Sequence, residues 1–515
     1  MTVNLRRVHE DHTAMARDRC LLGIDLGTSS VKAVVIDEGG TLLSTESIEY
    51  PIISPQPGWA EQDTRDWWEG TVRAVRKAAQ GLEDRVCAVG FSGQMHGTVL
   101  IDDNATPIGR AVIWADQRSV REVRDFTDAL GDDVLARVAG TVPATGFMGP
   151  TLLWLKRNQP ERLNATRFVM LPKDYIRLRM TGTIATEASD ASSTALFDVR
   201  RRSWSEEIIS MLGLPESLFP QVLDPSRVAG ELRDDQAREL GLHAGIPVVA
   251  GCADQVAQAV GNGLTEPGRG SVTIGSGGQI FIPLEAPVVN SALNLHVFCH
   301  APGNRWYIMG AILTAGLSLR WFRDLQNLSG RSGAYEHLSR IAAEVRPCSE
   351  GLIFLPYLAG ERSPHMDPKA RGSFAGLTMR HGTAHMARAI MEGVAFALRQ
   401  VMDTIAGLGI PVNELVAAGN GLTSPVWRQI VSDIFDKPLV FSRDGEQTGR
   451  GAALIAGIGA GVYSGYGELE AVLPSDTEVT EPIQSHREQY EDQYRRFCRL
   501  YPLLKQLMHE LNDEQ

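Results

Sequence analysis

The sequence lacks the features of several protein classes. None of its segments reaches 18 consecutive apolar residues, so no membrane-spanning helix is predicted. Basic residues are in deficit, with 50 Lys and Arg against 62 Asp and Glu and a net charge of -12, which argues against a nucleic-acid partner. No short repeat or low-complexity tract is present, which excludes solenoid and disordered architectures.

Cysteine is scarce and scattered. The chain has six cysteines and no Cys-x-x-Cys pair, so neither a disulfide framework nor a zinc site is predicted. Residues 1–20 are polar and lack the apolar core of a signal peptide, and we interpret them as an extension of the folded part. These absences together predict a cytoplasmic protein that is not attached to a membrane.

What is present is the composition of an ordinary globular protein. The 515 residues, of which 43% are hydrophobic and 22% charged, exceed the size at which one core stops growing, so two domains are expected. β-branched runs alternate with helical patterns, which is typical of an α/β fold. We place the domains at 20–245 and 246–483. A helix at 484–511 carries an apolar stripe that should pack on one of them, with the N-terminal domain as the candidate.

Two similar hairpins are predicted, one in each half of the chain. Strands at 21–26 and 31–36 flank Gly27-Thr28-Ser29-Ser30, and strands at 271–274 and 279–282 flank Gly275-Ser276-Gly277-Gly278. Small residues let backbone N–H groups point into one concavity, which can hold a phosphate, and Lys32 could add a charge. A single Gly/Ser turn more often only connects strands, but two at equivalent places predict two related halves that bind phosphate.

Two aspartates follow apolar strands near these turns. Asp25 could hold Mg²⁺ against a bound phosphate, and the alternative is that it caps its own turn. Asp254 could accept the proton of an attacking hydroxyl group, as phosphoryl transfer requires. Spacing alone favours the alternative for Asp254, which is the N-cap of the next helix.

A third glycine-rich turn follows the predicted strand at 415–418. Gly419, Asn420 and Gly421 lead into a helix that Ser424 should cap and Pro425 should begin. Such a turn lets a planar base or a phosphate approach the backbone closely. It is also a common way to reverse the chain in α/β proteins, so its specificity is modest.

Two further segments carry groups suited to a sugar. Gln94 and His96, after a strand at 86–91, offer donors and acceptors for hydroxyl groups, and Met95 offers an adaptable apolar wall. Trp114 and Asp116 add an indole face and a carboxylate. Each of these residues has a purely structural alternative. Reasoning from the residues therefore reaches a nucleotide-binding protein, with a kinase as one option.

At these positions the sequence resembles the FGGY family of carbohydrate kinases. The resemblance runs from about residue 21 to about residue 504, and its motifs together are highly specific. They are Gly23 to Ser29, Gln94 to Gly97, Leu171 to Gly182, Phe354 to Arg362, and Gly372 to Leu377 followed by His385 to Glu392.

The resemblance implies two actin-like domains with ribonuclease-H-type cores that enclose a catalytic cleft. ATP is expected mainly against the second domain and the sugar against the first. By resemblance, Asp254 becomes the catalytic base and Asp25 the Mg²⁺-linked carboxylate. Thr28 and Ser276 mark the phosphate turns, and the segment from Gly419 to Leu422 flanks the adenine.

Within the family, the motif from Gln94 to Gly97 favours D-xylulose as the acceptor. Members that act on xylulose usually carry Asn where this chain has Ala115, and again where it has Gln255; both positions fall in the expected sugar pocket. Gly277, Asn420 and Thr151 also depart from the usual pattern. Another ketose, a sugar alcohol or an aldonic acid stays an alternative substrate. A non-catalytic actin-like sugar sensor is less favoured, and a homodimer is the candidate assembly.

Overall fold

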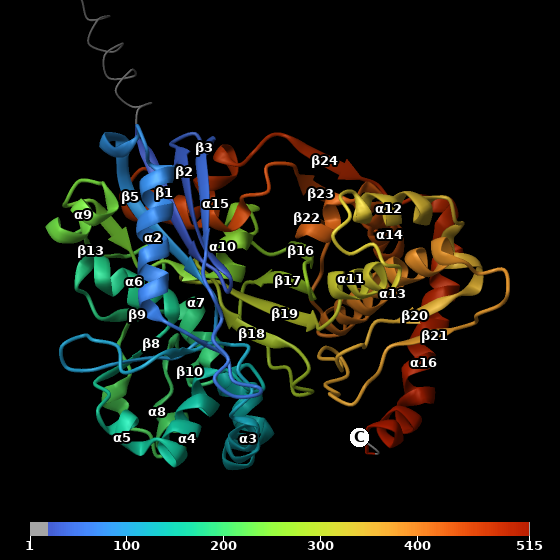
Figure 1. The fold of residues 1–515 in the computed structure, drawn as a ribbon, viewed down its shortest axis with the longest axis horizontal. Helices are drawn as coiled ribbons and strands as arrows, with labels where there is room; N and C mark the ends of the chain where they lie inside the picture. Colours follow the sequence, from blue (N-terminus) through green and yellow to red (C-terminus); the bar gives the residue numbers. More distant parts are fainter. Residues whose placement is uncertain (1–18, 514–515) are drawn as a thin grey trace, which may run out of the picture.

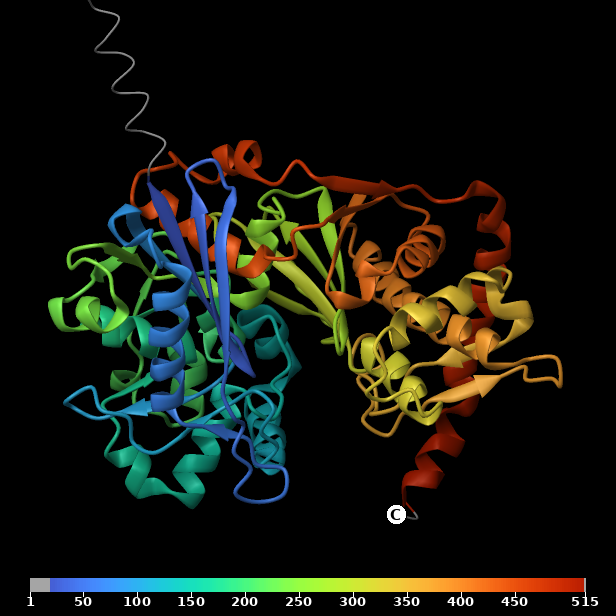
Figure 2. The ribbon, with the colours of Figure 1, turned by 45° about the horizontal axis from the view of Figure 1, so that its top comes forward.

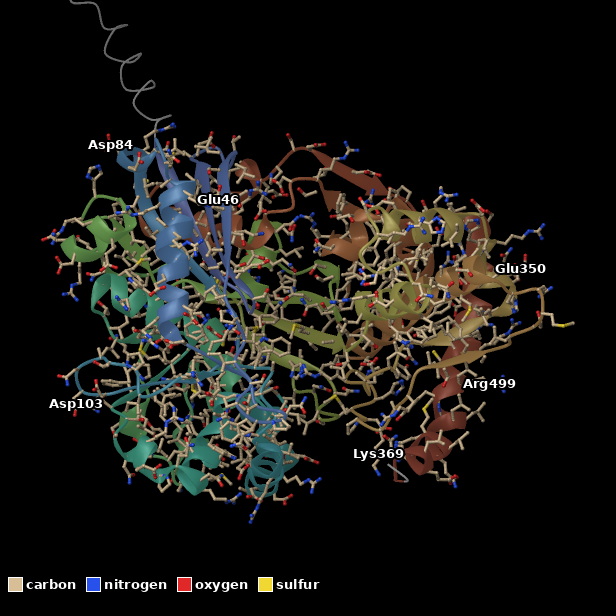
Figure 3. All side chains as sticks on the ribbon, in the orientation of Figure 1. Glu46, Asp84, Asp103, Glu350, Lys369 and Arg499 are labelled. Atoms are coloured by element: carbon tan, nitrogen blue, oxygen red, sulfur yellow. The ribbon has the colours of Figure 1, made fainter. Side chains whose placement is uncertain are left out.

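The computed structural model describes residues 19–513 and places two α/β lobes side by side (Figure 1). Most of the expected extension at 1–20 lies outside the described residues. Within the described range, no helix combines the length and the apolar character needed to cross a bilayer. Side chains fill the interior of both lobes, while charged groups such as Asp84, Asp103 and Arg499 project from the periphery (Figure 3). The predicted α/β class is confirmed.

The first lobe is built on a mixed sheet whose central strands are parallel. Strands β1 and β5 are parallel, as are β5 and β14, whereas β1, β2 and β3 form an antiparallel meander. The order across the sheet is β13 (Val228–Glu231), β14 (Pro247–Val249), β5 (Val86–Gly93), β1 (Cys20–Leu26), β2 (Ser30–Asp37) and β3 (Leu42–Glu49), with β15 (Cys252–Ala253) paired to β5.

The second lobe repeats this topology. Strands β16, β17 and β19 form the antiparallel meander, and β22 and β23 continue the sheet in parallel. The order is β18 (His296–Cys299), β19 (Trp306–Ile312), β17 (Gly278–Leu284), β16 (Arg269–Ile274), β22 (Glu414–Ala418), β23 (Leu439–Ser442) and β24 (Thr477–Thr480). Both predicted hairpins are therefore confirmed, and so is the relation between the halves.

Short strand pairs and helices complete both lobes. The pairs are β4 (Glu61–Gln62) with β7 (Ala111–Val112), β6 (Val99–Ile101) with β8 (Phe168–Met170), β9 (Ala185–Glu187) with β12 (Gln221–Leu223), β10 (Phe197–Asp198) with β11 (Ser203–Trp204), and β20 (Ile353–Leu355) with β21 (Ser373–Ala375). The helices are α2 (Thr64–Ala78), α3 (Val120–Val134), α4 (Met148–Asn158), α5 (Pro160–Asn164), α6 (Pro172–Thr181), α7 (Ala188–Ala191), α8 (Glu206–Met211), α9 (Asp234–Leu240), α10 (Asp254–Gly261), α11 (Gly316–Leu325), α12 (Ala334–Ala343), α13 (Thr383–Ala406), α14 (Pro425–Phe435), α15 (Gln447–Gly459) and α16 (Arg487–Asp513).

Helices α10 and α15 join the two lobes. Both contribute to a core cluster that also contains side chains of the first sheet and of the second, such as Leu21 and Phe281. In Figure 1, α15 lies among the strands of the first lobe although its sequence comes late in the chain. The approach is close: a Cβ on Gly23 would lie 2.0 Å from the carbonyl oxygen of Gly449. Only glycine at this position of β1 lets α15 pack so near the sheet.

The structure corrects the predicted domain boundary at 245/246. Strands β14 and β15, which that boundary assigned to the second domain, pair with β5 in the first sheet. Helix α15, which that boundary also assigned to the second domain, packs on β1 and β5 of the first sheet. The pattern of apolar runs could not show this, because a buried parallel strand reads the same in either sheet.

The C-terminal helix packs on the second lobe and not on the first, which corrects the other assignment. Its stripe, including Tyr494, Phe497 and Tyr501, is buried in the core of the second lobe. Hydrogen bonds fix the register, since the Tyr490 hydroxyl donates to Glu392 over 3.0 Å and the Tyr494 hydroxyl to Asp403 over 2.5 Å, both acceptors on α13. Figure 2 shows α16 along the outer side of that lobe.

Candidate active site

Two carboxylates lie where the parallel strands of the first lobe end. Asp25 near the end of β1 is in register with Ser92 of β5, and Ser92 is in register with Cys252 of β15. Asp254 follows β15 directly. Because parallel strands end at the same edge of a sheet, Asp25 and Asp254 reach one cleft-facing region from separate parts of the sequence.

Asp25 is held by its neighbours on the sheet. The Ser92 hydroxyl donates a 2.7 Å hydrogen bond to Asp25 Oδ1. Burial raises the pKa of Asp25, while the Ser92 hydrogen bond and the positive charge of Lys32 oppose that rise. The carboxylate thus sits on the strand, and within residues 19–513 its second oxygen accepts no hydrogen bond, so Asp25 does not act as the turn cap considered as its alternative.

Asp254 is the first residue of α10, and the N-cap position belongs to Ala253. Spacing alone favoured Asp254 as the N-cap of this helix, and that prediction is therefore wrong. Its Oδ1 accepts a hydrogen bond from the backbone N–H of Gln255 over 2.6 Å. Burial, and then the negative charge of Asp25, raise the pKa of Asp254 to about 7. A carboxyl group with such a pKa can gain and lose a proton near neutral pH.

His96 is fixed in one orientation and one tautomer. Its ring stacks on Phe147 with centroids 3.8 Å apart, and Nδ1 lies 2.7 Å from the carbonyl oxygen of Ser193. Burial lowers the pKa of His96 to about 3, so the ring is neutral. Nδ1 must then carry the proton and donate it to Ser193, which leaves Nε2 as an acceptor. The left-handed backbone of His96, φ 72°, is uncommon for a residue other than glycine.

Gln94 links its own segment, residues 94–97 (the sugar motif), to the first phosphate turn at residues 27–30. Its Nε2 donates to Gln62 Oε1 over 2.8 Å and to the Gly27 carbonyl oxygen over 3.3 Å, and Gln62 Nε2 donates to the Thr28 carbonyl oxygen. Gln94 Oε1 has no hydrogen-bond partner within the described part of the chain. Since buried polar atoms are normally paired, this oxygen is open to a ligand donor. Met95 is buried in the core cluster that spans the two lobes, and its role as an apolar wall for a sugar stays a prediction.

The structure exposes Trp114 and buries Asp116, and the predicted contact of Trp114 with a sugar stays a prediction. The indole of Trp114 is 42% exposed, and its Nε1 donates to Thr28 Oγ1 over 2.9 Å. Asp116 is 1% exposed and its carboxylate pairs with Arg118 over 2.8 Å while accepting from the N–H of Ala60. Its lone pairs are used to hold its own loop, so the structure favours a supporting role for Asp116 over direct contact with a sugar.

Gln255 connects the two lobes. It follows Asp254 on α10, and its Oε1 accepts a hydrogen bond from Nε2 of Gln279 on β17. The side chain therefore reaches toward the second sheet. Ala115, the other departure from the family pattern, is half-buried between Trp114 and Asp116.

The two phosphate turns are similar in composition but close differently, over four residues in the first and three in the second. In the first, the N–H of Gly27 donates to the Ser30 carbonyl oxygen over 3.0 Å and Ser29 is exposed. In the second, the N–H of Gly275 donates to the Gly277 carbonyl oxygen over 2.9 Å and Ser276 is exposed. Both leave a small hydroxyl side chain at the tip.

The surroundings of the two turns differ. Lys32, expected to add a charge to the first turn, pairs with Glu446 over 3.0 Å. The second turn lies against the start of α11, where the N–H groups of Ala315 and Leu317 bond to the Ser276 carbonyl oxygen. The N-terminus of α11 therefore donates these N–H groups to the second turn and holds it in place.

A cavity of about 740 Å³ opens beside the second phosphate turn. It brings together the predicted residues Gly275, Ser276, Asn420 and Gly421, which are far apart in sequence. Gly419 has φ 81°, and a Cβ there would lie 2.6 Å from the carbonyl oxygen of Ile274 at the end of β16. The third turn therefore packs directly on the strand that leads into the second one. Helix α14 begins as predicted, with the Ser424 hydroxyl accepting from the N–H of Trp427.

Sequence reasoning missed several residues of the site. In the cavity these are Arg320 on α11 and Tyr335 and Ser339 on α12, and behind the sugar motif they are Gln62 and Ser92. The small residues from Thr314 to Gly316 after a buried strand were a signal for α11. No signal in the sequence pointed to Tyr335 and Ser339 on α12, because polar and aromatic residues are common on any exposed helix face.

The residues present fit a magnesium ion. Within residues 19–513, no three or more His, Cys, Asp or Glu side chains gather in a way that could hold a metal by themselves. Mg²⁺ does not need such a cage, since it is commonly held by one or two carboxylates together with substrate phosphates and water. Asp25, near Asp254 and the first phosphate turn, meets that requirement.

Comparison with known proteins assigns the chain to a family. Residues 20–261 match the N-terminal domain of the FGGY family of carbohydrate kinases, and residues 270–460 match its C-terminal domain. This chain belongs to the FGGY family of carbohydrate kinases. It is therefore an enzyme that phosphorylates a small sugar, and the predicted pair of actin-like domains is confirmed.

Similar proteins cover almost the whole chain. A xylulose kinase of Escherichia coli is 35% identical, with 95% of this chain and 99% of that protein covered. A xylulose kinase of Lactococcus lactis is 34% identical, with 96% and 99% covered. A crystal structure of a "xyloylose kinase" from Brucella ovis superposes with a TM-score of 0.89 at 33% identity, covering 95% of this chain and all of that one.

Proposed function

We propose that this kinase transfers the γ-phosphate of MgATP to D-xylulose and forms D-xylulose 5-phosphate. The observation that carries the proposal is Asp254, a carboxyl group with a pKa of about 7 that follows β15 directly and lies near Asp25. The choice of sugar draws on the xylulose kinases that resemble this chain over nearly all of its length.

Asp254 acts as the base in this proposal. It accepts the proton of the terminal sugar hydroxyl as that oxygen forms a bond to the γ-phosphorus, and the bond from phosphorus to the leaving oxygen of ADP breaks. Asp25 raises the pKa of Asp254 and thereby strengthens it as a base. The sugar is oriented by Nε2 of His96 and Oε1 of Gln94, which accept hydrogen bonds from its hydroxyl groups.

The donor nucleotide occupies the 740 Å³ cavity of the second lobe. The adenine lies against Asn420 and Gly421, and the phosphates extend over Ser276 toward the first turn and Thr28. Asp25, directly or through water, holds Mg²⁺, which neutralises phosphate charge when bound. Lys32 acts indirectly in this arrangement, since its charge is paired with Glu446.

A second substrate class is favoured by one observation. Gln255 is bonded to Gln279, and Ala115 leaves the space of an amide vacant, so the two positions do not present the pair of amides expected of a xylulose pocket. Another ketose, a sugar alcohol or an aldonic acid could use the altered contacts. A non-catalytic sensor would have no use for a base such as Asp254.

The test is a coupled ADP-release assay of the purified enzyme across ketoses, polyols and aldonic acids. We expect Mg²⁺-dependent turnover of D-xylulose, with a kcat/KM above that of the other acceptors. Faster turnover of a different acceptor would replace D-xylulose in the proposal. Absence of turnover with every acceptor, in a sample that binds ATP, would overturn the kinase mechanism.

The proposal also includes the setting in which the enzyme works. We place it in the cytoplasm, where ATP and Mg²⁺ are supplied, and fractionation of the source cells tests this. A homodimer stays a prediction. Light scattering of the purified protein would decide between a monomer and a dimer.

A further inference from the structure

A buried segment of the first lobe, residues 188–194, carries an unusual number of polar side chains. This serine segment consists of α7 and the 3₁₀ turn that follows it, Ser192–Thr194. Burial of polar groups is costly unless they are bonded, so their partners show what the segment holds in place. The polar side chains, all 0% exposed, are those of Ser189, Asp190, Ser192, Ser193 and Thr194.

A buried group of charges anchors the start of the serine segment. The carboxylate of Glu187 caps α7 and accepts from the N–H groups of Ser189 over 2.6 Å and Asp190 over 2.9 Å. The Nζ atom of Lys173 lies 3.1 Å from Glu187 Oε1 and 3.2 Å from Asp190 Oδ2, and all three side chains are fully buried. Because breaking a buried ion pair is strongly destabilising, the place of the segment in the lobe is firmly set.

The hydroxyl groups of the segment bond both inward and outward. The Ser192 hydroxyl donates to the carbonyl oxygen of Ser189 over 2.8 Å, so its proton is used within the segment. Its Oγ then accepts from the N–H of Cys299 on β18 over 3.1 Å. A hydroxyl of this segment can therefore hold the backbone of another element, in this case a strand of the second lobe.

Ser189 holds the residue that precedes the base. Its Oγ accepts from the N–H of Ala253 over 3.1 Å. Ala253 is the N-cap of α10 and stands directly before Asp254. Helix α7 also packs against β15, which ends at Ala253. The bond from Ala253 to Ser189 thus fixes the backbone from which the side chain of Asp254 projects.

The other end of the serine segment holds the sugar motif. The carbonyl oxygen of Ser193 accepts from Nδ1 of His96 over 2.7 Å. Ser189 and Ser193 belong to one short, anchored element, so Asp254 and His96 share a single support. Their relative position matters because a general base must lie within hydrogen-bond reach of the proton that it accepts.

We propose that the serine segment sets the position of Asp254 relative to the ring of His96, and that Ser189 is the positioning residue for the base. This proposal rests on the proposed function, since it assumes that Asp254 is the base and that His96 orients the sugar. Ser189 acts through the backbone of Ala253 and does not contact the reacting atoms. A displacement of about 1 Å can slow a reaction about 100-fold, so a smaller shift of Asp254 should lower kcat while the sugar still binds.

The test compares Ser189→Ala with Ser192→Ala. Each change removes a fully buried hydroxyl whose oxygen accepts from a backbone N–H over 3.1 Å. Ser192→Ala also loses a bond within the segment, so its melting temperature should fall at least as far. We expect Ser189→Ala to lower kcat about 10-fold and to leave the dissociation constant of D-xylulose, measured by calorimetry, within about twofold. Ser192→Ala should keep kcat within about twofold of wild type.

A double-mutant cycle shows whether Ser189 acts through the base. If it does, Ser189→Ala should have little further effect on kcat in an enzyme that already carries Asp254→Ala. Loss of kcat by the same factor in both backgrounds overturns the proposal. An unchanged kcat in Ser189→Ala, or an equal loss in Ser192→Ala, also overturns it, because the hydroxyl then only stabilises the fold.

A second variant covers the case in which Ser189→Ala does not fold. Ser189→Cys keeps a side chain of similar shape with a weaker acceptor, and an unchanged kcat there overturns the proposal. Failure of the proposed function appears in other samples, as absent turnover in the wild type or near wild-type turnover in Asp254→Ala. Failure of the positioning role appears in the Ser189 variants while Asp254→Ala is impaired. All variants are measured with the acceptor that the wild type turns over fastest.

Discussion

The two lobes share one sheet topology but differ in the side chains and cavities that lie beside the sheet. In the first, the hairpin turn is followed by a strand edge that carries Asp25, Ser92 and the start of α10 with Asp254. In the second, the equivalent turn opens on a cavity lined by helices. The first lobe therefore concentrates charge and hydrogen-bonding groups, and the second provides the volume of a cavity.

The difference shows where chemistry is added to a repeated fold. Each lobe has a short turn of small residues at the equivalent place, Gly27 to Ser30 in the first and Gly275 to Gly278 in the second. Function depends on what the next strands and helices place beside it. We expect substitutions in the first lobe to affect transfer and the sugar, and those in the second to affect ATP.

The sharpest test of this division is Asp254→Ala. Loss of the base should reduce kcat roughly 10²- to 10⁴-fold, while ATP and sugar still bind, because the side chain acts mainly on the proton transferred during reaction. Steady-state kinetics and calorimetry measure the two effects separately. Asp254→Asn is the matched control of similar size, and near wild-type turnover in either variant would remove Asp254 from the mechanism.

Asp25→Asn tests the second carboxylate of the first lobe. A neutral amide holds a cation less well, so we expect the Mg²⁺ concentration for half-maximal rate to rise roughly 10- to 100-fold.

In the wild type, kcat should increase as pH rises through about 7, since Asp254 must be deprotonated. Asp25 raises that pKa, so its neutralisation should move the midpoint to lower pH. An unchanged Mg²⁺ titration and pH profile would return Asp25 to a structural role.

His96→Ala separates sugar binding from nucleotide binding. Loss of the acceptor Nε2 and of the ring stacked on Phe147 should raise the sugar KM roughly 10- to 100-fold and barely move the KM for ATP. Ser276→Ala in the second lobe should give the opposite pattern. Equal changes in both KM values for either variant would contradict the proposed division of labour.

The smallest expected effect concerns the two departures in the sugar pocket. Ala115→Asn combined with Gln255→Asn should raise selectivity for D-xylulose over competing sugars by a few-fold, about 1 kcal/mol. Shortening Gln255 also removes its bond to Gln279 and should loosen that contact between the lobes. The same ranking of acceptors in the double variant and the parent would show that these positions do not set the preference.

Much of the local structure was predictable. Hairpins, the Ser424 cap and the Pro425 helix start follow from short-range rules, since turn residues and apolar runs act over a few positions. For the same reason, the turns near Gly27, Gly275 and Gly419 could be proposed as ligand sites from the sequence. Arg320 and Ser339 could not, because nothing local distinguishes them from other polar residues on helices.

Contacts between distant segments were the part that local patterns did not show. β14 joins the first sheet, α15 packs on β1, and α16 covers the second lobe, because burial of matching apolar faces selects partners across hundreds of residues. Asp116 was misjudged for the same reason, since its partner Arg118 could not be known to fold back on it. Pairing of a carboxylate depends on the folded chain.

The sequence by itself determined the family, the two α/β halves and the residue types available for phosphoryl transfer, because motifs and periodicities are properties of short segments. Only the tertiary structure decided how those residues act. It set the pKa of Asp254 through burial and Asp25, and it fixed the tautomer of His96 through Ser193. Desolvation and the proximity of charges exist only once distant segments have packed together.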